Sequence, residues 1–328
     1  MFVKNKKLLL VIAVVAITLS IAALSYYFRE RLPGAETSIV QDRPVLKIGH
    51  LPITHSTALV MAHEKTGGEF SDFTLEVVNF SSWPELTEAL FAGRIDGAVM
   101  LFELALAGRQ RGIPIKAVAL GHRDGNVMVT RPEIASVSDL SGKRVAIPSR
   151  FSVHHVLLHK ALQDAGLTLE DVELVEMAPP DMMAALAGNE IAAYLVAEPF
   201  GAIAEVKGVG KVLLKSQDIW VNSTCCVLVL SEEVLRDNPK AAGELTAALL
   251  EAGREAEENP EKAADISSQY FGHAEDILIP GLARTTFSDL AISIDEFTKH
   301  QQYLIDLGVL LEPMELGELI NEELAGQR

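Results

Sequence analysis

The segment VLKIGHLPITHS at residues 45–56 decides the first part of the fold. It begins as an apolar strand, Val45 to Ile48, and ends in a polar turn that opens a helix. The segment RVAIPSRFS at residues 144–152 repeats this arrangement in the second half of the chain. The first backbone N–H groups of a helix have no partner within the helix, so each turn can receive an anionic or polar group. The two segments predict a ligand held between two lobes.

Strand and helix patterns alternate around both segments. This order predicts an α/β fold, in which helices cover both faces of a parallel sheet. We expect a discontinuous lobe 1, made of residues 44–125 and 225–328, and a lobe 2 made of residues 126–224. Ligands in such folds bind beyond the carboxyl ends of the strands, where the polar turns fall. Strands are expected at residues 45–49, 73–79, 97–100, 115–120, 126–130, 144–147, 172–176, 192–196, 211–214 and 226–230.

Bulk composition limits the classes of function. The chain has 328 residues, 49% of them hydrophobic, and a formal net charge of -17. This length is more than one compact α/β unit usually needs, which favours two lobes. Nucleic-acid binding requires clustered Lys and Arg, and no cluster occurs outside the first few residues, so we expect no nucleic-acid partner. Local dipoles must hold any bound anion, because the overall field opposes it.

The N-terminal segment indicates export. Lysines near the start precede an apolar stretch from Leu8 to about Ala23. This is the order of a secretory signal peptide, or of a membrane anchor with its positive end in the cytoplasm. Both alternatives stay open for residues 1–28, and residues 29–43 are expected to be a linker. The remainder is predicted to be periplasmic or otherwise extracytoplasmic, either free or anchored to the inner membrane by residues 8–28.

The two cysteines, Cys225 and Cys226, are neighbours in an apolar, β-branched run. Consecutive residues of a strand point to opposite faces, so we expect them not to pair and to act as small buried hydrophobic residues. His155 and His159 lie one helical turn apart, but no carboxylate or cysteine accompanies them at ligand spacing. We therefore expect no metal, no cofactor and no catalytic residue.

Several short strings follow one another in an order typical of one family. They are GHLPIT at 49–54, SW at 82–83, GRIDGA at 93–98, LSGKRVAIP at 140–148, AEPF at 197–200 and DIW at 218–220. Together they resemble periplasmic substrate-binding proteins of the nitrate, sulfonate, taurine and bicarbonate class of ABC importers. The resemblance extends from about Leu46 to Asn238.

The resemblance implies a fold like that of type II periplasmic binding proteins, whose two lobes close on a small polar or anionic ligand and pass it to a membrane permease. It implies that Trp83 walls the pocket, that Thr54 and Ser82 donate hydrogen bonds, and that His154 contacts a ligand oxygen. We expect a monomer. The chain departs from the family after Trp220, where nitrate and bicarbonate proteins carry a charged residue and residues 221–224 of this chain are uncharged. This departure leaves the identity of the ligand open.

Several candidates also have a structural explanation. Ser82 has the position of a helix N-cap with Glu85 as its capping-box partner. Arg123 and Arg150 can each capture an oxyanion or belong to a solvated turn. Glu198 lines the cleft or starts a helix, where a carboxylate is favoured by the helix dipole. The expected ligand-binding residues are His50, Pro52, Thr54, His55, Ser82, Trp83, Leu101, Phe102, His122, Arg123, Ser149, Arg150, Ser152, His154 and Glu198.

Three classes of function fit these observations. The first is a non-catalytic solute-binding protein that delivers a small ligand to an ABC importer. The second is an enzyme on the same fold, acting in pyrimidine or quinone precursor synthesis, although no nucleophile with a nearby base and no Gly-rich phosphate motif supports it. The third is a membrane-tethered sensor domain. We favour the first, which titration with candidate ligands tests. Turnover of a ligand would favour the enzyme, and a sensor would need a partner for its output.

Overall fold

The structure, a computed structural model, describes residues 43–326. The described residues from Pro44 onward form one compact unit, and all the elements below belong to it. The signal peptide or anchor predicted at residues 1–28 and almost all of the linker predicted at 29–43 lie outside the described residues. Between residues 43 and 326, no helix combines the length and the hydropathy that crossing a bilayer requires.

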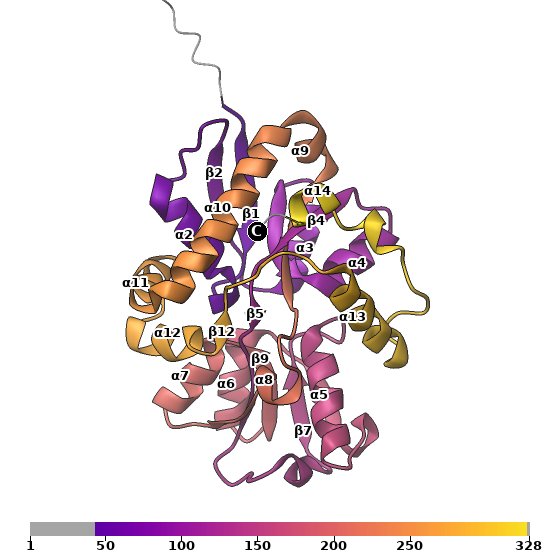
Figure 1. Cartoon of the computed structure of the whole chain (residues 1–328). Helices are drawn as coiled ribbons and strands as arrows, with labels where there is room; N and C mark the ends of the chain where they lie inside the picture. The colour runs from indigo at the N-terminus through magenta and orange to yellow at the C-terminus, as the bar shows by residue number, and fades with distance from the viewer. Residues whose placement is uncertain (1–42, 327–328) are drawn as a thin grey trace, which may run out of the picture. The chain divides into compact units, whose positions relative to one another are not determined.

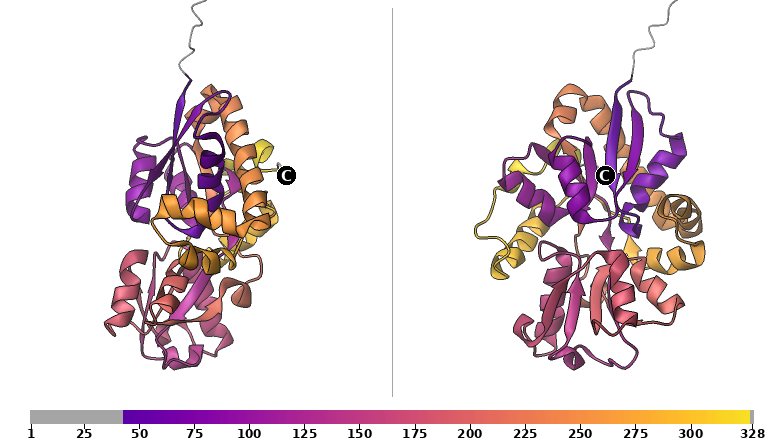
Figure 2. Two further views of the ribbon diagram at one scale, coloured as in Figure 1. Left: turned by 90° about the vertical axis from the view of Figure 1, so that its left-hand side faces the viewer. Right: turned by 180° about the vertical axis from the view of Figure 1, so that it is seen from behind.

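The first sheet has the strand order β2-β1-β3-β11-β4. Strand β1 (Val45–His50) pairs in parallel with β2 (Thr74–Asn79) and β3 (Gly97–Leu101), while β11 (Cys226–Ser231) runs antiparallel to β3 and to β4 (Ile115–Leu120). Helices α2 (Thr57–Thr66) and α10 (Pro239–Glu258) pack together on one face, and α3 (Trp83–Phe91) and α4 (Phe102–Gln110) lie on the other (Figures 1 and 2). Strand β3 is buried along its whole length because both faces are covered.

The second sheet has the order β10-β6-β9-β7-β8. Strand β7 (Arg144–Ile147) is parallel to β8 (Glu173–Glu176) and β9 (Ala193–Ala197), whereas β6 (Asn126–Thr130) is antiparallel to β9 and to β10 (Lys211–Lys215). Its helices are α5 (Val153–Asp164), α6 (Pro179–Ala187), α7 (Phe200–Val206) and α8 (Ser216–Ile219). Helices α5, α6 and α7 follow the turns at the carboxyl ends of β7, β8 and β9, in that order.

The predicted α/β class is confirmed, and each predicted strand has a counterpart within one or two residues. The expectation of parallel sheets is wrong for β6 and β11. A parallel neighbour requires a crossover, usually a helix, before the chain re-enters the sheet. Strand β6 follows the two-residue strand β5 (Arg123–Asp124) after Gly125 alone, and β11 arrives directly from the second sheet, so each enters its sheet antiparallel to its neighbours.

The C-terminal part covers an edge of the first sheet. It contains α9 (Glu232–Asp237), α11 (Pro260–Phe271), α12 (Glu275–Leu282), α13 (Ile294–Asp306), α14 (Glu322–Ala325) and β12 (Thr285–Thr286), which pairs with β5. Strand β4 is the last strand on its side of the sheet. Its backbone N–H groups at Ala117 and Leu120 donate to the carbonyls of Leu319 and Leu290, at 2.7 and 2.8 Å. The free side of β4 is therefore partly paired by irregular chain.

Replacing Gly97 with alanine should destabilise the first sheet. Gly97 sits in β3 between its neighbours on β1 and β11, and a Cβ atom there would lie 2.4 Å from the carbonyl oxygen of Val229 and 2.9 Å from Ile48 Cδ1. The backbone oxygen cannot move without disturbing the strand, so we expect a loss of about 1–3 kcal/mol in the free energy of unfolding, measured by denaturant titration. Gly243→Ala in α10 is the control, because the nearest atom lies 4.0 Å away, and equal losses in both variants would contradict the argument.

Candidate functional site

A pocket of about 840 Å³ lies at the carboxyl ends of strands from both sheets. One wall comes from the whole length of α3 and from α4 with the residue that follows it, and the other from the end of β8 and the turns after β7 and β8. Most of the lining is apolar, and it includes one tryptophan, one phenylalanine and three prolines. The lining residues are Ser82, Trp83, Pro84, Thr87, Glu88, Phe91, Ala92, Leu104, Arg111, Pro148, Ser149, Glu176, Met177, Ala178 and Pro179.

A few polar groups face this pocket. The hydroxyl oxygen of Thr87 is buried and has no hydrogen-bond partner among the described residues. Arg111 is exposed, and its guanidinium makes no hydrogen bond or ion pair within residues 43–326. The two carboxylates in the lining are paired, because Glu88 lies 3.2 Å from Arg94 and Glu176 accepts the Arg150 N–H at 2.6 Å. Thr87 and Arg111 therefore stand out as ligand-binding candidates, and no motif in the sequence marks them.

Three of the predicted ligand-binding residues line the pocket: Ser82, Trp83 and Ser149. Ser82 also caps α3 as predicted, since its hydroxyl accepts the Glu85 N–H at 3.4 Å. Trp83 is buried against the pocket wall. Pro52 lines a smaller neighbouring cavity of about 370 Å³. The structural and the functional explanations of Ser82 and Trp83 are therefore compatible.

The expectation that the two helix-opening turns offer unpaired amides is wrong at three positions. The N–H of Thr54 donates to the Glu198 carbonyl at 3.0 Å. The N–H of Arg150 donates to a Glu176 carboxylate oxygen at 2.6 Å, and that of Phe151 to the Ser149 hydroxyl at 3.0 Å. The Ser149 hydroxyl is a local partner of the kind that is common at turns, whereas Glu198 and Glu176 come from distant parts of the chain.

Other predicted residues are held in internal contacts. The Thr54 hydroxyl donates to the Glu198 carbonyl at 3.2 Å, and the Ser152 hydroxyl donates to the Ser149 carbonyl at 2.5 Å. The buried carboxylate of Glu198 accepts the Ala202 N–H at 3.0 Å and forms an ion pair with Arg284 at 2.5 Å. Burial raises the pKa of Glu198, and the Ala202 amide and Arg284 oppose that shift. None of these three predicted residues lines the pocket.

The two predicted arginines differ in environment. Arg123 is buried, and its guanidinium donates to the Asp289 carbonyl at 2.9 Å and to Glu296 at 3.1 Å, so it holds the C-terminal segment. Arg150 is exposed, and its guanidinium donates to the Leu174 carbonyl at 3.3 Å. Neither side chain faces the pocket.

Leu101, Phe102 and His50 belong to the core. Both Leu101 and Phe102 are fully buried, and the Phe102 ring packs against Phe297 with 4.2 Å between ring centroids. His50 is buried at the end of β1 with its Nδ1 3.0 Å from the Leu51 carbonyl. Burial lowers the pKa of His50 to about 4, so this side chain is a neutral core histidine.

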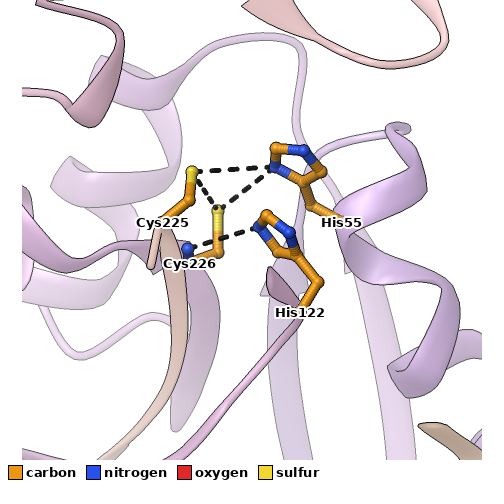
Figure 3. A group of neighbouring side chains, drawn as sticks. All are labelled: His55, His122, Cys225 and Cys226. Carbon is orange, nitrogen blue, oxygen red and sulfur yellow. Dashed lines mark hydrogen bonds between the residues drawn. The ribbon is translucent and has the colours of Figure 1, made fainter. Parts of the chain in front are cut away.

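The remaining predicted histidines come together with both cysteines. His55 and His122 stack, with 3.5 Å between ring centroids, and Figure 3 shows them beside Cys225 and Cys226. The two sulfur atoms are 3.6 Å apart, so the prediction that the cysteines point to opposite faces is wrong. The reason is that β11 begins at Cys226, and strand alternation does not extend to Cys225.

His154 lies near this group. It is buried at the start of α5, and neither ring nitrogen has a hydrogen-bond partner among the described residues. Burial, with a smaller contribution from the charge of His55, lowers its pKa to about 3. The sequence placed these histidines in separate turns, and no signal in it brought them to the cysteines.

The chain is similar in sequence to several proteins of known import systems. A model of the NMT1-like family matches residues 41–269. The nitrate import ATP-binding protein NrtC of Synechococcus elongatus is 31% identical over 233 residues, which cover 65% of this chain and 35% of that protein. The chain therefore spans about a third of the length of that relative. The taurine-binding periplasmic protein of Escherichia coli is 28% identical over 62% of this chain and 64% of its own length.

A solved structure shows the same fold. The ligand-binding component of an ABC-type import system from Staphylococcus aureus, solved with zinc bound, has a TM-score of 0.82 and 33% sequence identity. The likeness covers 86% of this chain and 98% of the staphylococcal chain. The resemblance to substrate-binding proteins found in the sequence is thereby confirmed.

Proposed function

Because the chain belongs to the NMT1-like family, we propose that it is the extracytoplasmic solute-binding component of an ABC importer. The observation that carries the proposal is the pocket of about 840 Å³ to which both sheets contribute. Residues 44–125 with 225–328 would form one lobe and residues 126–224 the other, closing on the ligand as binding proteins of this kind do. A membrane permease is the proposed partner, and the chain acts as a monomer, with residues 1–28 serving as signal peptide or membrane anchor.

The pocket favours an organic anion over a bare inorganic one. Trp83, Phe91 and Met177 supply apolar walls, and apolar walls with a few polar groups suit an organic body. The unpaired guanidinium of Arg111 and the unpartnered hydroxyl of Thr87 suit a sulfonate or carboxylate group. Relatives whose names include nitrate and taurine support an anionic or zwitterionic ligand for this chain as well.

Calorimetric titration of the full chain tests this proposal. The panel contains alkyl and aryl sulfonates, taurine, thiamine precursors, nitrate, bicarbonate and Zn²⁺, and we expect binding of an organic anion. Binding without turnover is also proposed, so mass spectrometry should recover the ligand unchanged. Conversion of the ligand would favour the enzyme alternative, and failure of every organic anion to bind would refute the proposed ligand class.

Trp83→Leu should weaken binding of that organic anion at least about tenfold, because the variant removes the largest apolar wall of the pocket. Trp220→Leu is the matched control, since Trp220 packs against His300 and Tyr303 outside the pocket lining. The same titration measures both variants, and thermal unfolding checks that each is folded. Unchanged affinity in Trp83→Leu, or an equal loss in Trp220→Leu, would show that the ligand binds elsewhere.

A further inference from the structure

Two imidazoles and two thiols form a buried group apart from the ligand pocket (Figure 3). His55 comes from the short helix η1 (Thr54–Ser56), His122 from the residues between β4 and β5, and Cys225 and Cys226 from the start of β11. Each is at most 1% exposed. One ligand atom from each residue lies within 4.8 Å of those from the other three. We refer to these four side chains as the Cys2His2 cluster.

The spacing of the atoms matches the edges of a metal-centred tetrahedron. Zn–S bonds of about 2.3 Å and Zn–N bonds of about 2.0–2.1 Å give edges of roughly 3.8 Å between two sulfurs and roughly 3.6 Å between sulfur and nitrogen. The Cys225 and Cys226 sulfurs are 3.6 Å apart, and His55 Nδ1 lies 3.8 and 3.7 Å from them. Three corners of such a tetrahedron are therefore already in place.

The backbone fixes which nitrogen of His55 faces the sulfurs. Its Nε2 lies 3.0 Å from the carbonyl oxygen of Gly125. A carbonyl oxygen only accepts, so Nε2 carries the proton and Nδ1 keeps its lone pair toward both thiols. A ring N–H held by a backbone carbonyl is the usual support of a metal-bound histidine.

His122 supplies the fourth group. Its ring stacks on His55 at an interplanar angle of 23°, and its Nε2 accepts the backbone N–H of Cys226 at 3.3 Å. Coordination of a metal by Nε2 would use this lone pair, so it would replace the hydrogen bond from the Cys226 N–H. Burial keeps the pKa of His122 well below its usual value, so the ring is neutral, which is the form that coordinates a metal.

Charge balance suits a divalent ion at this depth. A dication with two thiolates and two neutral imidazoles has no net charge, so the filled site avoids the cost of burying an isolated charge. Burial raises the pKa of the Cys225 thiol well above its usual value, and binding must therefore displace thiol protons. Metal binding replaces each S–H bond with an S–metal bond and releases the protons to solvent.

We propose that the Cys2His2 cluster is a tetrahedral binding site for Zn²⁺. Thiolate and imidazole donors in this number are the set that selects zinc among the common divalent ions. The ion would join η1, which follows β1 of the first sheet, to two segments that connect the sheets. These segments are residues 120–126 and 223–226. None of the four residues lines the ligand pocket, so the site is independent of the proposed importer ligand.

Spectroscopic titration of the reduced, chelator-treated full chain with Co²⁺ tests the proposal. We expect one equivalent of Co²⁺ to give the visible bands of a tetrahedral site and a thiolate-to-cobalt charge-transfer band, both abolished by one equivalent of Zn²⁺. Calorimetry in buffers of different ionisation enthalpy should show release of about two protons per Zn²⁺. These readouts use the unaltered chain and do not depend on any variant folding.

Variants then assign the ligands. Cys225→Ser and Cys226→Ser should each weaken Zn²⁺ binding by more than about 100-fold, beyond the loss typical of an outer-shell partner. His154→Gln is the matched control, because His154 is an equally buried neighbour outside the cluster, and it should keep the charge-transfer band. Absence of that band in the unaltered chain, Zn²⁺ binding that survives both serine variants, or a Cys225–Cys226 disulfide in the chain isolated without reductant would overturn the proposal.

Discussion

Arg284→Met is expected to lower the free energy of unfolding by about 3–5 kcal/mol, because it leaves a buried carboxylate without its cation. Arg284 Nη1 lies 2.5 Å from Glu198, whose side chain is 0% exposed. With the arginine removed, the Ala202 N–H at 3.0 Å is the remaining hydrogen bond to that carboxylate. Glu205, the second partner of Arg284, stays 35% exposed and can be solvated. Urea titration at pH 7 measures the loss.

Two controls isolate the buried pair. Arg236→Met removes an exposed arginine that pairs with Asp237 at 2.8 Å, and it should leave the free energy of unfolding nearly unchanged. Adding Glu198→Gln to Arg284→Met should recover most of the stability, because the uncompensated charge disappears. The deficit of Arg284→Met should also shrink as the pH falls, since a protonated Glu198 needs no cation. A deficit that persists in the double variant and at low pH would show that lost packing is the cause.

Acid should destabilise the protein through His50 by about 3 kcal/mol between pH 7 and pH 4. Burial lowers the pKa of His50 from 6.5 to about 4. The folded state therefore binds fewer protons than the unfolded state in this range, so the stabilisation is present above pH 6.5 and is lost as the pH falls toward 4. Denaturant titrations at several pH values, with chelator present, measure the slope.

His50→Gln should flatten that slope. The other buried histidines are unchanged in the variant, so the difference between the two slopes reports His50 alone. His273→Gln is the control, because His273 is only half-buried, so a smaller change in slope is expected. An unchanged slope in His50→Gln would mean that His50 takes up its proton in the folded state.

The alternation of apolar runs with polar turns was sufficient to predict where the strands of both sheets lie in the sequence. The strand at Ile115–Leu120 appears within the predicted bounds because all its residues except Lys116 are apolar and buried. The direction of β6 and β11 could not be predicted, because periodicity carries no information on whether a strand arrives through a crossover or from another sheet.

The site was predicted less completely than the fold. Ser82 and Trp83 follow a strand and start a helix, and such positions reach the pocket in this fold. Thr87 lies within α3 and Arg111 directly follows α4. In the sequence, such residues cannot be told apart from residues of a helix face that only contacts solvent. Thr54 was expected to bind ligand, but its amide and hydroxyl contact Glu198, which is 144 positions away in the chain. Contacts over such separations depend on the packed fold and leave no local pattern.

The irregular chain that pairs with β4 has a consequence for biosynthesis. Leu319 comes far later in the chain than Ala117, so the unprotected backbone of β4 stays available to other chains until this late segment has been made. A bare strand edge is a template for intermolecular pairing. Chains truncated before Leu316 should therefore self-associate and precipitate, and a folding helper would be needed most while the nascent polypeptide lacks that covering segment.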